Sequence, residues 1–369
     1  MQDKFPITVA TTTLSAFIVA SCTVYSEVGF FETPTPVITG YRVLAIRTDV
    51  TSALQPEPDE KWSRAQALPF ETVEITPFIV DEFGVVDPGD LDVLWLSCEG
   101  MRERFQSECL ALAFPLTLAE IPDCPVQGLE QLMGETLPES VSPCLIGRKG
   151  TPDYVVPLSA ALLDDWLGSL DLTGIELTMI ASIAAGTSAD ECATQILNGS
   201  ARPQGCLHST TYLDVGPLDS FMQIAADLGL DVPEIEASKV VSDGYGPVRN
   251  PRISEFRVTS IDDEHIAETM ILKRGEVIRA PLGARLNIEI EFDVAGDLNS
   301  FDSEGWYRTW GEFPVYSEYA MGQNEWTIIS GDQDEPSTPP GGRAWLYYVV
   351  RDGWFGIDWF WFGVEPSGL

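Results

Sequence analysis

The sequence predicts a mainly β protein made of two immunoglobulin-like β-sandwich modules. Apolar residues alternate with polar ones at a period of two, as in residues 71–84, where Val73 and Ile75 face one side and Thr72 faces the other. Pro, Gly and Asp interrupt these runs, as in the predicted turn at 87–90. The length of 369 residues favours about two domains, at roughly 150 residues each.

The first module is expected over residues 40–216. Trp95, in the middle of its third run, is typical of a core residue on a central strand. The succession of strand-like runs is interrupted at about residues 99–170. There we expect a cysteine-rich, partly helical insertion that includes a short helix over 156–168. The predicted strands are residues 40–50, 71–84, 91–98, 174–186 and 208–216.

Residues 217–250 are expected to form a helix, over 217–230, and a linker before the second module at 251–369. The run 251–259 aligns with 41–48 at an offset of 210, and Leu286-x-Ile288 aligns with Val73-x-Ile75 at an offset of 213. The two offsets suggest a duplicated module. Further strands are expected at 284–294, 305–313 and 325–332, followed by a hairpin that turns at Asp352-Gly353.

The N-terminus has the pattern of an export signal. The apolar run Leu14–Ala20 is shorter than the about 20 residues that a membrane span needs. The motif Val19-Ala20-Ser21-Cys22 resembles a bacterial lipobox. The resemblance implies a signal peptide over 1–21, lipidation of Cys22 and a tether over 22–39. An uncleaved N-terminal helix and a simple secretory signal remain alternatives.

The remaining cysteines agree with export. Removing Cys22 leaves six, and an even number in an exported protein favours disulfides. We expect sequence neighbours to pair, although some could be free and buried. Without a C-x-x-C motif, and with two histidines in the chain, a zinc site is not expected. The expected pairs are Cys98–Cys109, Cys124–Cys144 and Cys192–Cys206.

The charge argues against nucleic-acid binding. The chain has 57 acidic and 21 basic residues, a formal net charge of −36, and such a surface repels phosphate backbones. The sequence contains no G-x-S-x-G, H-E-x-x-H or P-loop motif. His265 lies in a charged segment that reads as a solvated loop, and His208 opens a strand. We therefore expect no catalytic residue and no cofactor, with an exported glycan-directed hydrolase that uses carboxylates as the alternative.

Two acidic stretches are candidates for calcium binding, because hard cations bind clusters of oxygen ligands. Neither fits the EF-hand loop, and solvated acidic turns would look the same. A calcium-stabilised adhesion module is therefore a further alternative. The candidate ligands are Asp297, Asn299, Asp302, Asp332 and Asp334.

Seven of the ten tryptophans lie between residues 306 and 361. In the run 357–365, Trp359 and Trp361 share one face, and Phe360 and Phe362 share the other. A sandwich strand needs only one apolar face, so the second must be covered by the other module, by a partner protein or by a glycan. With Trp354, the two tryptophans form a candidate binding face.

The stretch 348–359, with Asp352, Gly353 and Gly356, is similar to the last hairpin of immunoglobulin-like and PKD-like bacterial modules. With the lipobox and the early strand at 41–48, the chain resembles predicted envelope lipoproteins of myxobacteria. The resemblance implies a non-catalytic binding, adhesion or scaffolding role at the outer membrane, with an envelope protein or glycan as partner. Thr23 follows Cys22 where an inner-membrane lipoprotein would carry Asp.

Overall fold

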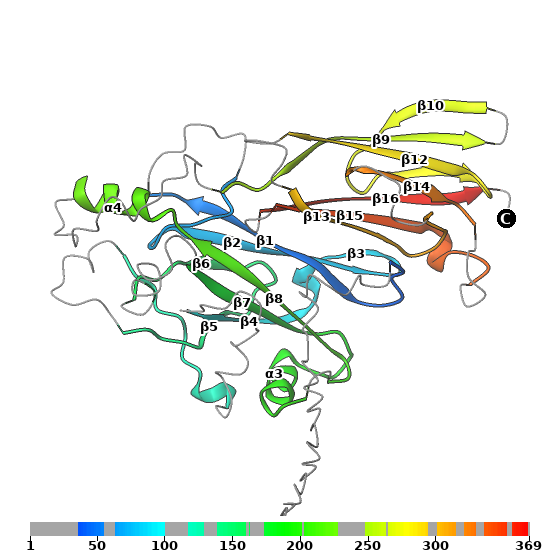
Figure 1. Cartoon of the computed structure of the whole chain (residues 1–369). Coiled ribbons are helices and arrows are strands. Elements are labelled where there is room, and N and C mark those ends of the chain that lie inside the picture. Colours follow the sequence, from blue (N-terminus) through cyan, green and yellow to red (C-terminus); the bar gives the residue numbers. More distant parts are fainter. Residues whose placement is uncertain are drawn as a thin grey trace, which may run out of the picture.

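The structure is a computed structural model in which four β-sheets are stacked (Figure 1). We number the sheets I to IV, from the lower part of Figure 1 to the upper. The structure describes residues 36–54, 63–99, 117–128, 139–159, 162, 173–200, 203–227, 248–262, 265–293, 301–314, 321–329, 336–352 and 356–367. The prediction of a mainly β chain with antiparallel, immunoglobulin-like sheets is confirmed.

Sheets I and II form the first sandwich. Sheet I has the order β5-β4-β7-β8, and in sheet II β2 pairs with β1, β3 and β6. Trp95 of β4 is fully buried between the two sheets. The strands of sheet I are β4 (Asp92–Cys98), β5 (Cys144–Gly147), β7 (Thr173–Ser182) and β8 (Cys206–Val215), and those of sheet II are β1 (Arg42–Ser52), β2 (Thr72–Asp81), β3 (Gly84–Val86) and β6 (Asp153–Val155).

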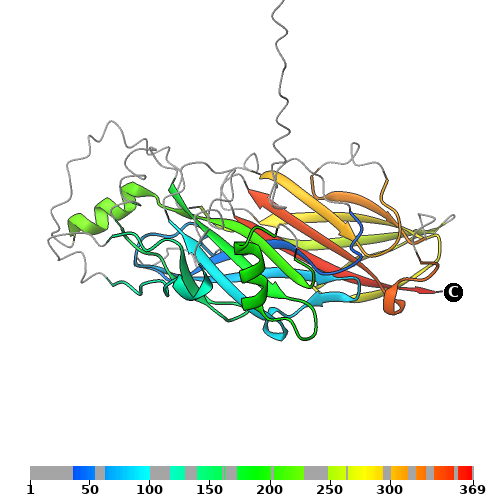
Figure 2. The same cartoon turned by 90° about the horizontal axis from the view of Figure 1, so that it is seen from below.

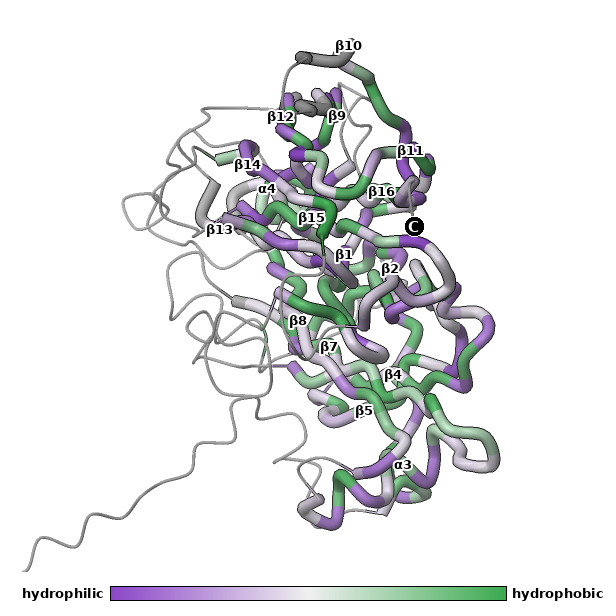
Figure 3. The backbone as a smooth tube through the Cα atoms, turned by 90° about the vertical axis from the view of Figure 1, so that its right-hand side faces the viewer, coloured by the Kyte–Doolittle hydropathy of each residue, from purple (hydrophilic) through white to green (hydrophobic). Residues whose placement is uncertain are grey.

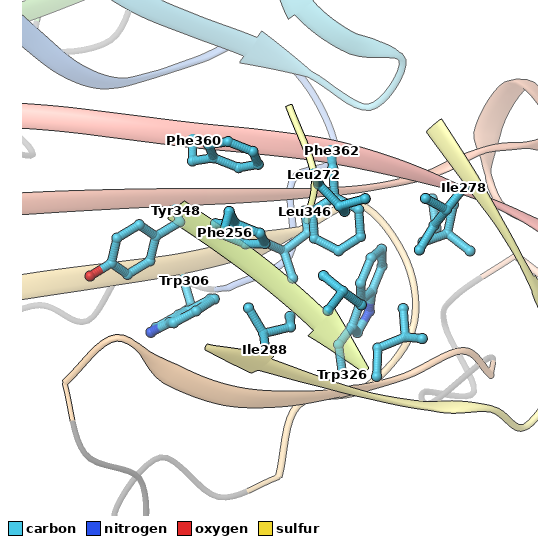
Figure 4. Close-up of a cluster of buried hydrophobic side chains, with 14 of the residues drawn as sticks. Phe256, Leu272, Ile278, Ile288, Trp306, Trp326, Leu346, Tyr348, Phe360 and Phe362 are labelled. Atoms are coloured by element: carbon cyan, nitrogen blue, oxygen red, sulfur yellow. The ribbon is translucent and has the colours of Figure 1, made fainter. Parts of the chain in front are cut away.

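Sheets III and IV form the second sandwich. Their orders are β11-β16-β15-β13 and β10-β9-β12-β14. Phe256 and Phe360 stack at 4.1 Å between ring centroids in its core (Figure 4). The strands of sheet III are β11 (Val277–Pro281), β13 (Phe301–Arg308), β15 (Ala344–Asp352) and β16 (Ile357–Ser367), and those of sheet IV are β9 (Arg252–Asp262), β10 (His265–Ile271), β12 (Arg285–Asp293) and β14 (Gln323–Thr327).

The order of pairing is that of immunoglobulin-like domains. In such domains, whose seven strands are lettered A to G, strands A, B and E share one sheet, and strands C, F and G share the other. Strands β3, β5, β10 and β11 of this chain are additional to that pattern. The first sandwich has β1, β2 and β6 in one sheet and β4, β7 and β8 in the other; the second has β9, β12 and β14 facing β13, β15 and β16. Strand C of each sandwich, which is β4 in the first and β13 in the second, carries a buried tryptophan, Trp95 and Trp306 respectively.

The first strand pairs of the two sandwiches, β1 with β2 and β9 with β12, share one register. The offsets of 210 and 213 that relate the sequences carry the pair Thr48 and Ile75 of β1 and β2 onto Val258 and Ile288 of β9 and β12. A register is set independently in each strand pair by its own buried face. The agreement therefore supports the suggested duplication.

A β-bulge occurs at the same place in both strand pairs. The pairing of β1 with β2 skips Leu44, and the pairing of β9 with β12 skips Ser254, which is equivalent at the same offset. A bulge bends and twists its strand and has to fit the packing around it. Its repetition in both strand pairs is a second structural observation that supports the suggested duplication.

Helix α3 (Ala189–Leu197), which was not predicted, covers the outer face of sheet I (Figure 2). Ser188 begins it with a capping box to Glu191, and the Cys192–Cys206 disulfide joins it to β8. The predicted helix near 217–230 is confirmed as α4 (Leu218–Asp227). Of the predicted helix over 156–168, residues 160, 161 and 163–168 lie outside the described residues.

The expected insertion is smaller than its bounds of about 99–170 suggest, because it contains β5 and β6. β5 pairs with β4 in sheet I, and β6 pairs with β2 in sheet II. Strands of three or four residues, such as these, are too short to show a period-two pattern. Both are part of the sandwich itself.

The two sandwiches are joined by a third apolar core between sheets II and III, which we call the central seam. Phe78 of β2 stacks on Trp359 of β16 at 5.0 Å and meets the ring of Tyr347 edge-on at 6.1 Å. Sheets II and III are thus buried on both faces, and apolar stretches run along their strands in Figure 3. The seam contains Ile38, Leu44, Ala45, Phe78, Val80, Tyr307, Tyr347, Val349, Ile357 and Trp359.

Replacing Phe78 with alanine should lower the free energy of unfolding by about 3–5 kcal/mol, because it leaves a cavity among the rings of Tyr347, Trp359 and Trp361. Chemical denaturation measures the change. Phe83, two residues past the end of β2 and 61% exposed, is the matched control, and its replacement with alanine should change the stability by less than about 0.5 kcal/mol. Equal effects of the two substitutions would contradict the described seam.

Candidate functional site at the rim of the central seam

At one margin of the central seam the aromatic residues reach the surface, and we call this region the seam rim. Trp345 of β15 and Trp361 of β16 are half-buried there. Phe83 and Val85, in and after the β2–β3 turn, are 61% and 39% exposed. Monomeric proteins rarely gather large apolar side chains at one exposed place without a binding role.

Two glycines allow the ring of Trp345 to lie close to the backbone. A Cβ atom on Gly363, its partner on β16, would lie 3.0 Å from the ring, and one on Gly84 would lie 3.4 Å from it. Gly84 also has a φ of 145°, which favours glycine. The local backbone therefore holds Trp345 in place at the rim.

Charged groups border the rim on sheet III. Arg343 donates two hydrogen bonds, at 2.8 and 3.0 Å, to one carboxylate oxygen of Glu365, and Arg279 lies 3.5 Å from the other oxygen. The hydrogen bonds from Arg343 lower the pKa of Glu365, with a smaller contribution from Arg279. Fixed aromatic rings beside oriented hydrogen-bonding groups can bind a ligand.

Further along β16, opposite Val350, a buried carboxylate links the two sandwiches. Asp358 of β16 is 1% exposed. Arg274 donates to both of its oxygens at 2.7 and 2.8 Å, Arg47 of β1 donates at 3.2 Å, and the backbone N–H of Ile253 donates at 2.8 Å. The carboxylate has enough charged and neutral donors to offset its burial.

Asn250 makes a second polar link across the seam. Its side-chain nitrogen donates to the carbonyl oxygen of Thr48 on β1 at 2.7 Å, and its side-chain oxygen accepts from the N–H of Ile357 on β16 at 2.8 Å. The amide therefore joins sheets II and III directly. Together with Asp358, it fixes the two sandwiches in one orientation and thereby fixes the rim.

The predicted binding face is only partly at the surface. Trp359 is 9% exposed and lies under Phe78, so it belongs to the interior of the seam. The apolar face of β16 needed a cover, and the first sandwich supplies it. Trp361 remains at the rim, and Trp354 lies outside the described residues.

Two of the expected disulfides are present. Cys124 pairs with Cys144, and Cys192 pairs with Cys206. Cys98 is also disulfide-bonded. Cys109 and the expected lipidation site Cys22 lie outside the described residues.

Of the candidate calcium ligands, Asp302 lies in β13, and Asp297, Asn299, Asp332 and Asp334 lie outside the described residues. Within the described ranges, no three His, Cys, Asp or Glu side chains gather closely enough to hold a metal ion. His208 lies in β8, as expected. His265 begins β10, which corrects the prediction of a loop.

Trp345, Phe83 and Val85 were not predicted as site residues from the sequence. Alternation along β15 could have indicated Trp345. Trp345, Tyr347 and Val349 point to one face, which the seam covers, whereas the residues between them point into the core of the second sandwich. No local signal marks Phe83 or Val85, which reach the rim through the packing of one sandwich on the other.

The comparisons with known proteins leave the family open. No family model matches the sequence, and no curated protein matches it significantly. The crystal structure of titin domains Z1Z2 in complex with telethonin is similar over 87% of this chain and 97% of that one, at 9% identity and a TM-score of 0.17. Dimeric latent PorU from Porphyromonas gingivalis is similar over 88% of this chain and 24% of that one, at 11% identity and a TM-score of 0.20.

These TM-scores are too low to assign a function, and the fold class follows from the strand order. Among the helices of the described residues, none combines the length and the apolar character needed to span a membrane.

Replacing Asp358 with asparagine should lower the free energy of unfolding by about 1.5–3 kcal/mol, because two arginines lose a charged acceptor. Chemical denaturation measures the loss. The matched control is Asp190, which is 51% exposed and pairs with Arg148; replacing it with asparagine should cost less than about 1 kcal/mol. An Asp358 variant as stable as the Asp190 variant would contradict the link.

Proposed function

We propose that the protein is a lipid-anchored component of a bacterial cell envelope that binds an envelope partner and has no catalytic role. The observation that supports this function best is the seam rim, where Trp345 and Trp361 are held at the margin of two fused sandwiches. Tryptophans supply large contact areas at low entropic cost and often dominate binding energies. A surface protein or a glycan of the envelope is the proposed partner.

The scaffold suits this role because it keeps the rim rigid. The two rings lie on neighbouring strands, and Asp358 and Asn250 hold the first sandwich against those strands. A preorganised surface loses little conformational entropy on binding. The lipid on Cys22 would keep this surface at the outer membrane, at the end of the tether expected over residues 22–39.

Replacing Cys22 with alanine should move the protein from the membrane fraction to the soluble fraction, because the acyl chains would have no attachment site. Mass spectrometry of the N-terminal peptide should show a lipidated Cys22 in the unsubstituted protein. Replacement of the nearby Ser26 with alanine is the control and should leave the protein in the membrane fraction. An unlipidated peptide, or one that begins at Met1, would contradict the anchor.

Replacing Trp345 and Trp361 together with alanine should weaken binding to envelope proteins or polysaccharides by at least about thirtyfold, if each ring contributes about 1 kcal/mol or more. Pull-downs with the full protein, after circular dichroism has shown that the variant folds, measure the loss. The matched control replaces Val126 and Ile271, which are 82% and 65% exposed elsewhere on the surface. Equal binding by the two double variants would exclude the rim as the binding site.

A further inference from the structure

Glu99 is a buried acid that the proposed binding role does not use. It follows the last residue of β4 and is 6% exposed. Neither of its carboxylate oxygens has a partner with the distance and angle of a good hydrogen bond, although the hydroxyls of Ser159 and Ser140 lie near enough to act on the carboxyl group. Its own backbone N–H donates to the hydroxyl of Ser142 at 3.1 Å. Buried polar groups nearly always have a partner, so this exception needs an explanation.

The surroundings of Glu99 are polar but uncharged. The groups that act on its side chain are the hydroxyls of Ser159 and Ser140. Beyond them, Ser97 of β4 and Tyr154 of β6 share a buried hydrogen bond of 2.8 Å. Burial raises the pKa of Tyr154, so the phenol stays neutral and cannot supply a charge.

No described cation offsets a charge on Glu99. The other ionisable groups of the elements packed around it are acidic: Asp92 at the far end of β4, Asp153 on β6 and Glu139 on the segment before β5. Glu176 on β7 lies opposite Cys98, between residues that point into the core, and so lies on the other face of sheet I. Among the residues that the structure describes, an ionised Glu99 would therefore be a buried charge without a counterion.

Elementary electrostatics then determines which form of Glu99 the fold prefers. Burial raises the pKa of Glu99, and the hydroxyls of Ser159 and Ser140 oppose the shift only in part. A group whose pKa is raised on folding stabilises the fold at low pH. That stabilisation is lost as the pH rises through the pKa of the folded state.

We propose that Glu99 is a proton-dependent latch: its neutral carboxyl group allows residues 139–143 and 156–159 to pack on the end of β4, and loss of the proton loosens this end of the first sandwich. An ionised carboxylate needs water, and water can reach it only if the two segments move apart. Cys144, which begins β5 and is disulfide-bonded to Cys124, follows the first segment directly. The latch therefore connects pH to the disulfide-bearing side of the molecule.

Hydrogen exchange of the full protein, measured across a range of pH and corrected for intrinsic rates, tests the proposal. In peptides from 139–159 the population of the open form should rise by up to about tenfold for each pH unit between the ordinary carboxyl pKa of the open form and the raised pKa of the closed form, and should level off above that pKa. Peptides from β12 and β15 should show no such rise. Glu99→Gln, which is neutral at every pH, should abolish the rise, and Glu139→Gln, at an exposed site, should retain it.

A pH-dependent opening that persists in Glu99→Gln would overturn the proposal. If that variant does not fold, infrared spectroscopy of the unsubstituted protein decides. The carbonyl band of a protonated carboxylic acid should disappear over the pH range in which residues 139–159 open. Absence of that band while those residues remain protected would also overturn the proposal.

Discussion

The structure depends on one packing constraint, which is that two of its four sheets have no polar face. Sheets II and III each present apolar side chains on both sides, and water can be excluded from all of them only if the two sandwiches pack against each other. The stacking of Phe78 on Trp359 is the centre of that contact. Four stacked sheets follow from this constraint. Helix α3 covers the outer face of sheet I, and charged side chains such as Arg257 and Glu291, which form an ion pair, lie on the outer face of sheet IV.

Polar groups then determine how the sandwiches are oriented. Apolar packing is non-directional, whereas Asp358 and Asn250 make hydrogen bonds that connect β1 to β16 in one arrangement. That arrangement leaves Trp345 and Trp361 at the margin of the seam. The proposed binding surface is therefore a product of the whole fold, in which each sandwich contributes one side.

Much of the fold could be predicted from local pattern, because period-two runs, turns and neighbouring cysteines carry their own signals. The two faces of β16 were also predicted correctly from residues 359–362. What covers the second face could not be predicted, since no local pattern says which distant surface meets it. The run Phe78-Ile79-Val80 could have predicted that β2 has a second covered face, because three consecutive apolar residues indicate a strand buried on both sides. Ser188 and Glu191 likewise have the sequence pattern of a capping box, which indicates the start of α3.

Differential scanning calorimetry of the full protein tests the central claim most directly. If the central seam joins the sandwiches into one cooperative unit, a single transition should appear, with equal calorimetric and van't Hoff enthalpies. Two separate transitions, or a calorimetric enthalpy about twice the van't Hoff value, would show that each sandwich unfolds on its own. The seam would then be a contact between independent domains, which would contradict the account.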